Sequence, residues 1–516
     1  MLVGVLSGQA KDTSNTPRKC PQISAMLVPR TRIARVATLA IFSFWLAPSV
    51  RSADANPNIV LILVDDMGYG DPGCFNSDSK IPTPNIDSLA AEGMRFTDAH
   101  ASGPLCHMSR YGLMTGRYPF RIDVGRWPKQ ALIGPTETTL PSLLDDAGYR
   151  TAMVGKWHVG FNENGYDKPL DGGPADRGFN SFFGIRASTD IPPYFYIRDR
   201  MAVAPPSDSI AANQSKGWSP IQGAFWRAGG IAPGLVLKDV LPKFTDEACG
   251  VIESHAGHEE PLMLYVAFPA PHTPWLPSKA FSGKSGAGMY GDFAMMVDAM
   301  IGRILKQLDA ANMSDDTLVI FTSDNGPVWY ESDVERFGHD SSGGLRGMKA
   351  DAWECGHRMP MIARWPGTVP ASSVCDKTIS FVDFLATADE LVGGNVFDNE
   401  DQTDVGPDSF SFLSELTGKP SDALQRHSLA MKSGRGMMTI RRGDWKLIEG
   451  DGSGGFSGRA NKKDANKPLK GQLYNLADDL GETNNLIEQR PDVVQSLRDE
   501  LAAIVKAKRS RTLVTK

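Results

Sequence analysis

The chain has 516 residues, with 54 basic and 60 acidic side chains and a formal net charge of −6. This length allows one large domain or a large domain plus a small one, and its 41% hydrophobic and 22% charged residues exclude wholesale disorder. The mildly acidic balance argues against a nucleic-acid binder, whose surface carries a basic patch. Six cysteines are too few for a scaffold built from disulfides.

Residues 1–55 have the layout of an export signal. Three arginines precede an apolar run over 36–48, and a small-x-small site, Ala53-Asp54-Ala55, follows it. This order is typical of a secretory signal peptide, with a membrane anchor or a buried helix as the alternative. We predict that translation starts at Met26 and that residues 1–55 are absent from the mature protein. The mature chain is then expected in the periplasm or outside the cell, without a membrane span.

The next part of the chain alternates between two apolar patterns. Three short, continuous apolar runs end in polar residues and predict fully buried strands; they cover 58–64, 262–268 and 317–322. Three stretches have the apolar spacing of helices; they cover 87–92, 139–147 and 293–311. This alternation predicts an α/β fold with a large mixed, mostly parallel sheet sandwiched by helices.

The pattern changes after about residue 428. Short strands follow, and an amphipathic helix begins at Pro491. We therefore predict a catalytic α/β domain over 56–427 and a smaller C-terminal subdomain over 428–516, made of an antiparallel sheet and a helix. The Pro-, Gly- and aromatic-rich segment 186–240 predicts long loops.

Two polar pairs follow predicted strands directly. Asp65 and Asp66 come after the first strand, and Asp324 and Asn325 come after the strand at 317–322. Ligands of open α/β sheets bind at the carboxyl ends of the strands, and adjacent buried carboxylates repel each other unless a cation compensates. Four oxygen-bearing side chains without His or Cys favour Ca²⁺ or Mg²⁺ over zinc. The alternative is helix capping or Asx turns.

A cysteine and two basic side chains are further candidates. Cys106 precedes Arg110 by four residues, which at a helix start predicts a lowered thiol pKa and a reactive cysteine; the alternative is a small buried hydrophobe. Lys156 and His158 lie two residues apart, so on one strand they would face the same way and could address one anionic substrate.

A histidine and a lysine complete the set of candidates. His272 stands between Pro271 and a Thr-Pro pair, which stiffen its loop. Lys349 follows a Gly-rich turn. For Lys349 the alternative is an ordinary solvated charge.

These segments, in this order, resemble the type I sulfatases, formylglycine-dependent, arylsulfatase-like enzymes of the alkaline phosphatase superfamily. The similarity extends from about Asn58 to the C-terminal helix. The matching phrases are Cys106 with Ser109, Arg110 and Thr115-Gly116, Gly155-Lys156-Trp157-His158, Trp353-Glu354 with Gly356 and Arg358, Gly443-Asp444-Trp445-Lys446-Leu447 and Leu473-Tyr474-Asn475-Leu476.

The resemblance implies a sulfatase that removes sulfate from an organic sulfate ester, such as a sulfated carbohydrate. It implies that a maturation enzyme oxidises Cys106 to formylglycine, whose hydrated aldehyde attacks the sulfate sulfur and divides the reaction into two steps. It also implies Ca²⁺ as the cofactor, which neutralises charge and activates the nucleophile. The implied metal ligands are Asp65, Asp66, residue 106, Asp324 and Asn325.

The resemblance also implies roles for the basic side chains. Arg110, Lys156, His272 and Lys349 would bind the sulfate ester and stabilise its charge. His272 would protonate the leaving alcohol, and His158 would remove the diol proton in the second step, tasks that suit imidazole.

The chain departs from the family pattern at two positions. Met108 stands where the family has Pro or Ala, a position that the maturation enzyme reads, and Cys355 replaces a glycine. Met108 supports one alternative, a catalytically silent glycan-binding protein. A second alternative, a phosphoester hydrolase on the same fold, usually carries Ser or Thr and a second metal with His ligands, and Cys106 argues against it.

Two loops are predicted to shape the pocket beyond the sulfate. They lie within 186–240 and 451–471 and offer aromatic faces for sugar rings and cations for further sulfates. The alternative is ordinary loop packing. The side chains concerned are Trp218, Phe225, Trp226, Lys462 and Lys463.

Overall fold

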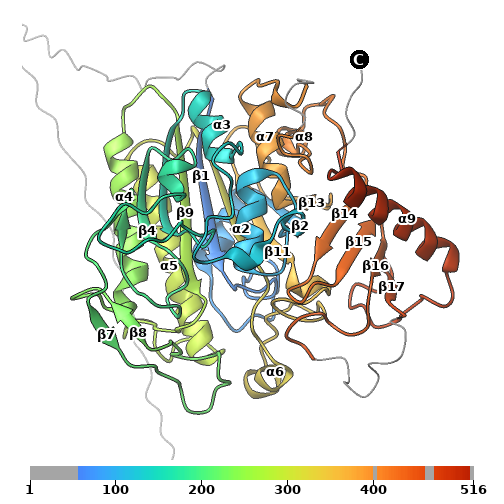
Figure 1. Ribbon diagram of the computed structural model, residues 1–516, viewed down its shortest axis with the longest axis horizontal. Coiled ribbons are helices and arrows are strands. Elements are labelled where there is room, and N and C mark those ends of the chain that lie inside the picture. Colours follow the sequence, from blue (N-terminus) through green and yellow to red (C-terminus); the bar gives the residue numbers. More distant parts are fainter. Residues whose placement is uncertain (1–55, 399–403, 459–469, 512–516) are drawn as a thin grey trace, which may run out of the picture. The chain divides into compact units, whose positions relative to one another are not determined.

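Figure 1 shows a computed structural model of the chain, which describes residues 56–398, 404–458 and 470–511. The predicted export signal, Lys462 and Lys463 lie outside the described residues. Asn56–Lys516 form one compact unit, so the boundary predicted at 427 stays a prediction. Among the described helices, none combines the length and apolar character needed to cross a bilayer.

A large mixed sheet forms the centre of the molecule. Its strands lie in the order β12-β2-β11-β10-β1-β9-β3-β4-β5-β6, with β13 paired to β2. The central pairs from β10 to β4 are parallel, and β11 runs antiparallel between β10 and β2. The bounds are β1 Asn58–Asp65, β2 Met94–His100, β3 Arg150–Lys156, β4 Ser181–Ile185, β5 Ile197–Arg198, β6 Met201–Ala202, β9 Leu262–Pro271, β10 Thr317–Ser323, β11 Arg358–Arg364, β12 Ser373–Cys375 and β13 Ile379–Ser380.

Helices cover both faces of this sheet, as Figure 1 shows. Ile59, Leu61 and Leu63 of β1 belong to the apolar core shared with α2, α3, α7 and α8, whereas the alternate residues of β1 pack with α1, α4 and α5. β1 is therefore buried on both faces, which explains its continuous apolar sequence. The bounds are α1 Pro84–Ala91, α2 Cys106–Thr115, α3 Leu140–Asp146, α4 Val240–His255, α5 Gly288–Ala310, α7 Phe384–Leu391 and α8 Leu413–Thr417.

A small antiparallel sheet and a helix follow near the C-terminus (Figure 1). Apolar residues of this sheet pack against Leu497, Leu501 and Ile504 of the helix and against Tyr118 and Val382 of the preceding part. The elements are β14 Leu429–Lys432, β15 Met438–Arg442, β16 Trp445–Ile448, β17 Gln472–Asn475 and α9 Pro491–Ala507. The predicted fold class is confirmed in both its parts.

The segment 186–240 contains more regular structure than predicted. β5 and β6 extend the main sheet by antiparallel pairing, and β7 Asp208–Ile210 pairs with β8 Gly229–Ile231. These strands are only two or three residues long, too short for their periodicity to be recognised in the sequence.

Candidate active site

Strand register brings the two polar pairs together. β1 and β10 are parallel neighbours in which Val64 pairs with Ser323, so the residues that follow each strand lie side by side. Asp65 of β1 is also the register partner of Pro271 at the end of β9, which brings His272 to the same edge. The carboxyl ends of three strands thus form one site, as the sequence predicts.

Cations surround the clustered carboxylates. Lys156 Nζ donates to Asp65 Oδ2, and Arg110 donates through Nε and Nη2 to Asp324 Oδ2 at 2.9 and 2.7 Å. Lys349 Nζ donates to Asp66 Oδ1 at 2.5 Å. Three buried carboxylates therefore face three buried cations, the compensation that adjacent Asp residues require.

The pKa of Asp65 shows the effect of these cations. Burial alone would raise it, but Lys156 and then other nearby cations outweigh burial and lower the pKa of this carboxyl below its ordinary value. Asp65 is therefore held ionised and can act as a ligand for a cation.

Asp66 and Asn325 are linked in an unusual backbone arrangement. Asp66 has a φ of 64°, a left-handed conformation that is uncommon for residues other than glycine. Its N–H donates to Asp324 Oδ1 at 3.3 Å, and its Oδ1 accepts from Asn325 Nδ2 at 2.6 Å. Asp66 is thus joined to both members of the polar pair that follows β10.

Cys106 is the first residue of α2 and lies within this cluster. Its thiol donates to Asp65 Oδ1 at 3.4 Å, and Lys349 Nζ lies 3.4 Å from Sγ. Burial, then Asp324 and Asp65, raise the pKa of the thiol well above its ordinary value. The predicted lowering of this pKa is wrong, because burial and two carboxylates outweigh the helix start and the neighbouring cations.

Lys156 and His158 do not share a strand face. β3 ends at Lys156, and His158 lies beyond it with a φ of 59°. Lys156 is directed to Asp65, whereas His158 lines the cavity beside Cys106. Burial, then Lys156, lower the pKa of His158 well below its ordinary value, so its imidazole is neutral near pH 7.

His272 lies between the cluster and the open side of the site. Its Nδ1–H donates to the Thr273 carbonyl at 2.7 Å, and its Nε2 lies 3.6 Å from Asp66 Oδ2. Its side chain is 12% exposed, in contrast to the fully buried Lys156. The hydrogen bond to Thr273 fixes the ring orientation and leaves Nε2 directed to the site.

The oxygen cluster fits a hard divalent cation. Asn325 Oδ1 is buried and has no hydrogen-bond partner among the described residues, although buried carbonyl oxygens normally have one. Ligand atoms of Asp65, Asp66, Cys106 and His272 lie within 4.8 Å of one another. Carboxylate and amide oxygens are the ligands that Ca²⁺ prefers. The predicted ligands thus lie in one cluster; they are Asp65, Asp66, residue 106, Asp324 and Asn325.

A cavity of about 220 Å³ opens onto this cluster. Cys106, His158, His272 and Lys349 line it, whereas Arg110 and Lys156 lie behind Cys106 and are almost fully buried. A substrate in this cavity would meet the first four side chains directly.

A family model described as Sulfatase matches residues 57–394. N-acetylgalactosamine-6-O-sulfatase of Bacteroides thetaiotaomicron is 32% identical over 87% of this chain and 93% of its own length, and human arylsulfatase A is 32% identical over 86% of each chain.

The chain belongs to the sulfatase family.

Solved structures agree with this assignment. A structure from work on glycosaminoglycan metabolism by Bacteroides thetaiotaomicron has a TM-score of 0.76 and 32% identity, and the match covers 87% of the sulfatase described here and 99% of that chain. A sulfatase from a Pseudoalteromonas species has a TM-score of 0.66 at 24% identity over 89% and 92% of the two chains, which shows the fold alone. The predicted enzyme class is confirmed: the protein is a sulfatase.

Several residues that line the cavity of this sulfatase were not predicted from the sequence. His107 stacks on Trp127 with ring centroids 5.1 Å apart, and burial, then Lys156, lower the pKa of His107 to about 4. Asp190, Arg227 and Phe456 also line the cavity. His107 directly follows Cys106 and Asp190 follows the end of β4, so their positions after a motif and a strand were the available signals.

The predicted substrate loops divide into lining and packing residues. Phe225 lines the cavity, but Trp218 stacks on Phe337 at 5.6 Å and Trp226 donates through Nε1 to Ala211. Only Phe225 of these three aromatic side chains is thus placed for contact with a ligand in the cavity.

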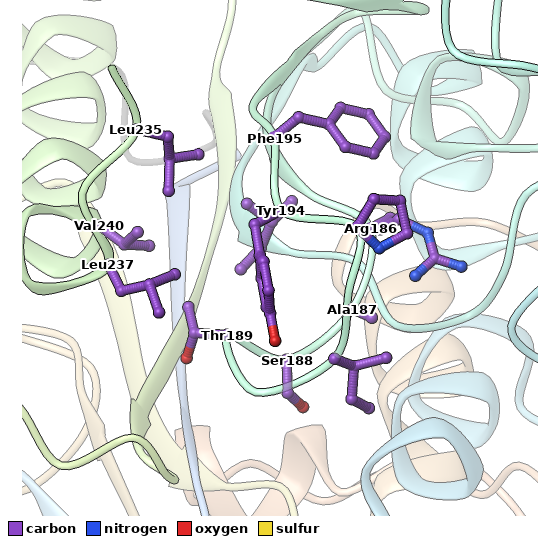
Figure 2. Close-up of a pocket in the computed structure, with 12 residues that line it drawn as sticks. Arg186, Ala187, Ser188, Thr189, Tyr194, Phe195, Leu235, Leu237 and Val240 are labelled. Atoms are coloured by element: carbon purple, nitrogen blue, oxygen red, sulfur yellow. The ribbon is translucent and has the colours of Figure 1, made fainter. Parts of the chain in front are cut away.

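A second, smaller cavity lies behind the loop at 186–195. Figure 2 shows Leu237 and Val240 facing Tyr194 across it. Its volume is about 10 Å³, about that of one water-sized probe. This cavity is a gap in the packing that supports the loop, and the reactive side chains lie elsewhere.

A second group of titratable residues joins the two sheets. His100 and His357 share a 2.9 Å hydrogen bond, and Lys446 Nζ of the small sheet lies 2.9 Å from Glu354 and 2.8 Å from Glu482. His100, His357 and Glu354 are close enough to hold a metal. Lys446 pairs with both carboxylates, so the group forms an internal ion-pair network.

The described cysteines are all free thiols. They are Cys74, Cys106, Cys249, Cys355 and Cys375.

Proposed function

We propose that this sulfatase hydrolyses the sulfate ester of a carbohydrate, with a formylglycine formed from Cys106 as nucleophile and Ca²⁺ as the bound cation. The observation that carries the proposal is the position of Cys106, between Asp65 and Lys349 at the floor of the cavity. Relatives named for sulfated N-acetylgalactosamine support a sugar substrate.

The cofactors would be held by residues already in place. Asp65, Asp66, Asp324 and Asn325 would hold Ca²⁺ together with residue 106, and the ion would supply a positive charge for the sulfate. Formylglycine would supply a hydrated aldehyde oxygen as nucleophile. Its formation requires a maturation enzyme that accepts Met108.

Two of the basic side chains would act from the cavity wall and two from buried positions. Lys349 and His272 line the cavity and would contact the sulfate ester directly, while Arg110 and Lys156 would add positive charge from behind Cys106. His272 would donate a proton from Nε2 to the leaving alcohol. His158, which is neutral and has a buried Nδ1 without a partner among the described residues, would accept a proton. In the net reaction water cleaves the sulfate ester, and the products are an alcohol and inorganic sulfate.

The export prediction belongs to this proposal. Residues 1–55 would direct the chain to the periplasm or the exterior, where sulfated polysaccharides are accessible.

The test combines peptide mass and turnover. The tryptic peptide 96–110 from the protein made in its native host should show the mass loss expected when the Cys106 thiol becomes an aldehyde. An unmodified thiol in that peptide would instead support the silent glycan-binding alternative.

A comparison of sulfate-ester and phosphate-ester hydrolysis tests the second alternative, a phosphoester hydrolase. We expect release of inorganic sulfate from N-acetylgalactosamine 6-sulfate and from 4-nitrophenyl sulfate. Faster hydrolysis of 4-nitrophenyl phosphate would favour a phosphoester hydrolase.

A further inference from the structure

We propose that Asp190 is a specificity-determining residue that accepts a hydrogen bond from a hydroxyl group of the sulfate ester. The inference rests on the proposed function and narrows its substrate to polyhydroxy compounds whose hydroxyl lies close to the sulfated oxygen. Esters without such a hydroxyl, such as simple aryl sulfates, would lack this contact.

The Asp190 carboxylate has one satisfied and one unsatisfied oxygen. Oδ2 accepts from Arg227 Nη1 at 2.5 Å, but Oδ1 is buried and has no hydrogen-bond partner among the described residues. The side chain is only 6% exposed and lines the cavity. A buried carboxylate oxygen without a donor is costly, so a donor on the ligand would satisfy it.

Asp190 lies beside His272, the proposed proton donor to the leaving alcohol. Its Oδ1 is 3.9 Å from His272 Nδ1, whereas His272 Nε2 is 3.6 Å from Asp66 Oδ2. The imidazole of His272 therefore lies between the carboxylate cluster and Asp190. Asp190 and His272 line the same cavity, so a hydroxyl group of an ester bound at His272 can reach Asp190 Oδ1.

Among the residues that the structure describes, none supplies the missing donor. The Nδ1–H of His272 is already donated to the Thr273 carbonyl at 2.7 Å. The loop is also fixed, because Ile191 N donates to Ser188 O at 3.0 Å and Arg227 N donates to Asp190 O at 3.3 Å.

The charges of Asp190 and Arg227 determine which group of a ligand fits beside them. Arg227 is paired with Asp190, so the two side chains together carry no net charge, and Oδ1 can only accept a hydrogen bond. A neutral hydroxyl donor is the ligand group that fits, since hydrogen bonds to a charged acceptor are among the stronger ones.

The inference is tested by combining variants of the enzyme with deoxy analogues of the substrate, as in a double-mutant cycle. The substrates are methyl N-acetyl-β-galactosaminide 6-sulfate and its 3-deoxy and 4-deoxy analogues, and the variants are Asp190→Asn and the control Asp171→Asn. Asp171 pairs with Arg200 on the surface and is 63% exposed. Values of kcat/KM are measured for each combination, and binding is measured by calorimetry in a Cys106→Ser background.

The expected result is a coupled loss. Asp190→Asn should lower kcat/KM for the parent sugar by about 10- to 100-fold, the range for a hydrogen bond to a charged group. With the wild-type enzyme, one deoxy analogue should have a kcat/KM lower than that of the parent sugar by the same factor. For that analogue, Asp190→Asn should lower kcat/KM no further. Asp171→Asn should leave kcat/KM unchanged for every sugar. The Cys106→Ser protein should show the same pattern in binding.

Two other patterns would overturn the inference. An equal loss on all three sugars would show that Asp190 acts through His272, and no loss on any of them would show that it makes no contact. If the wild type hydrolyses no sulfate ester while the binding pattern persists, the proposed function fails and the inference stands. If hydrolysis occurs without the coupled loss, the inference alone fails.

Discussion

Lys349 and Cys106 are 243 residues apart in sequence, yet Lys349 Nζ lies 3.4 Å from Cys106 Sγ. The same ammonium donates to Asp66 Oδ1 at 2.5 Å, so one lysine joins the position of the nucleophile to the carboxylate cluster. Asp66 raises the pKa of Lys349 well above its ordinary value, although burial alone would lower it. Lys349 is therefore a permanent cation at the floor of the cavity.

Replacement of this lysine should reduce catalysis. We expect Lys349→Met to lower kcat toward 4-nitrophenyl sulfate by about 10²- to 10³-fold, the usual effect of removing one charge-stabilising group. The exposed Lys306 on α5 provides the control, and Lys306→Met should leave kcat unchanged. Equal kinetics for both variants and the wild type would remove Lys349 from the proposed site.

The amide of Asn325 should contribute to Ca²⁺ affinity. At 100 times its Kd, Ca²⁺ should stabilise the wild-type fold by about 2.7 kcal/mol. If Asn325→Ala weakens binding a hundredfold, the gain at the same concentration falls to about 0.4 kcal/mol. Thermal unfolding with CaCl₂ and with a chelator measures both values without any need for turnover. The exposed Asn484→Ala should behave like the wild type, and an unaltered Ca²⁺ response in Asn325→Ala would contradict the assigned ligand.

Much of the candidate site could be predicted because its polar side chains follow recognisable strands. β1, β9 and β10 are continuous apolar runs, and Asp65, His272 and Asp324 come at or just after their ends. The sheet edge on which they meet is then a consequence of parallel register. The resemblance supplied the association of Cys106 with Lys349, since nothing local to either residue indicates it.

Properties that depend on packing could not be predicted. The pKa of Cys106 is set by burial and by carboxylates from other strands, which outweigh its position at a helix start. Near the buried Lys349, Ala350 N donates to Pro104 O at 2.8 Å and Ala352 N donates to Ser453 O at 2.7 Å. These contacts join distant segments, and neither composition nor spacing reveals them.

A close backbone approach should make Gly326 intolerant of substitution. A Cβ at this position would lie 1.8 Å from the Cys355 carbonyl oxygen, and Gly326 N donates to Gly356 O at 3.1 Å. Gly326→Ala should therefore push the loop after β10 away from the turn at 354–356. We expect loss of sulfate-ester turnover and of Ca²⁺-dependent stabilisation.

Gly250 provides the matched control for this change. It lies in α4, and a Cβ there meets nothing within 4 Å. Gly250→Ala should raise the free energy of unfolding by up to about 1 kcal/mol, because alanine is the better helix former. If Gly326→Ala retained full activity, the close approach would not be needed for the site.

The pH dependence of stability should depend on Glu482. Lys446 is shared between Glu354 and Glu482, and burial, outweighing Lys446, raises the pKa of Glu482 from 4.5 to about 7. Between these two values the unfolded chain has lost a proton that the folded chain retains, so the contribution of Glu482 to stability falls as pH rises from about 4.5 to 7.

Glu482→Gln keeps the shape of the side chain and removes this titration. Urea unfolding from pH 4.5 to 8 should show a flatter profile for the variant, with a difference of at most about 3 kcal/mol across the range. The exposed Glu488→Gln should follow the wild-type profile, and a Glu482→Gln profile parallel to that of the wild type would show that Glu482 is ionised throughout.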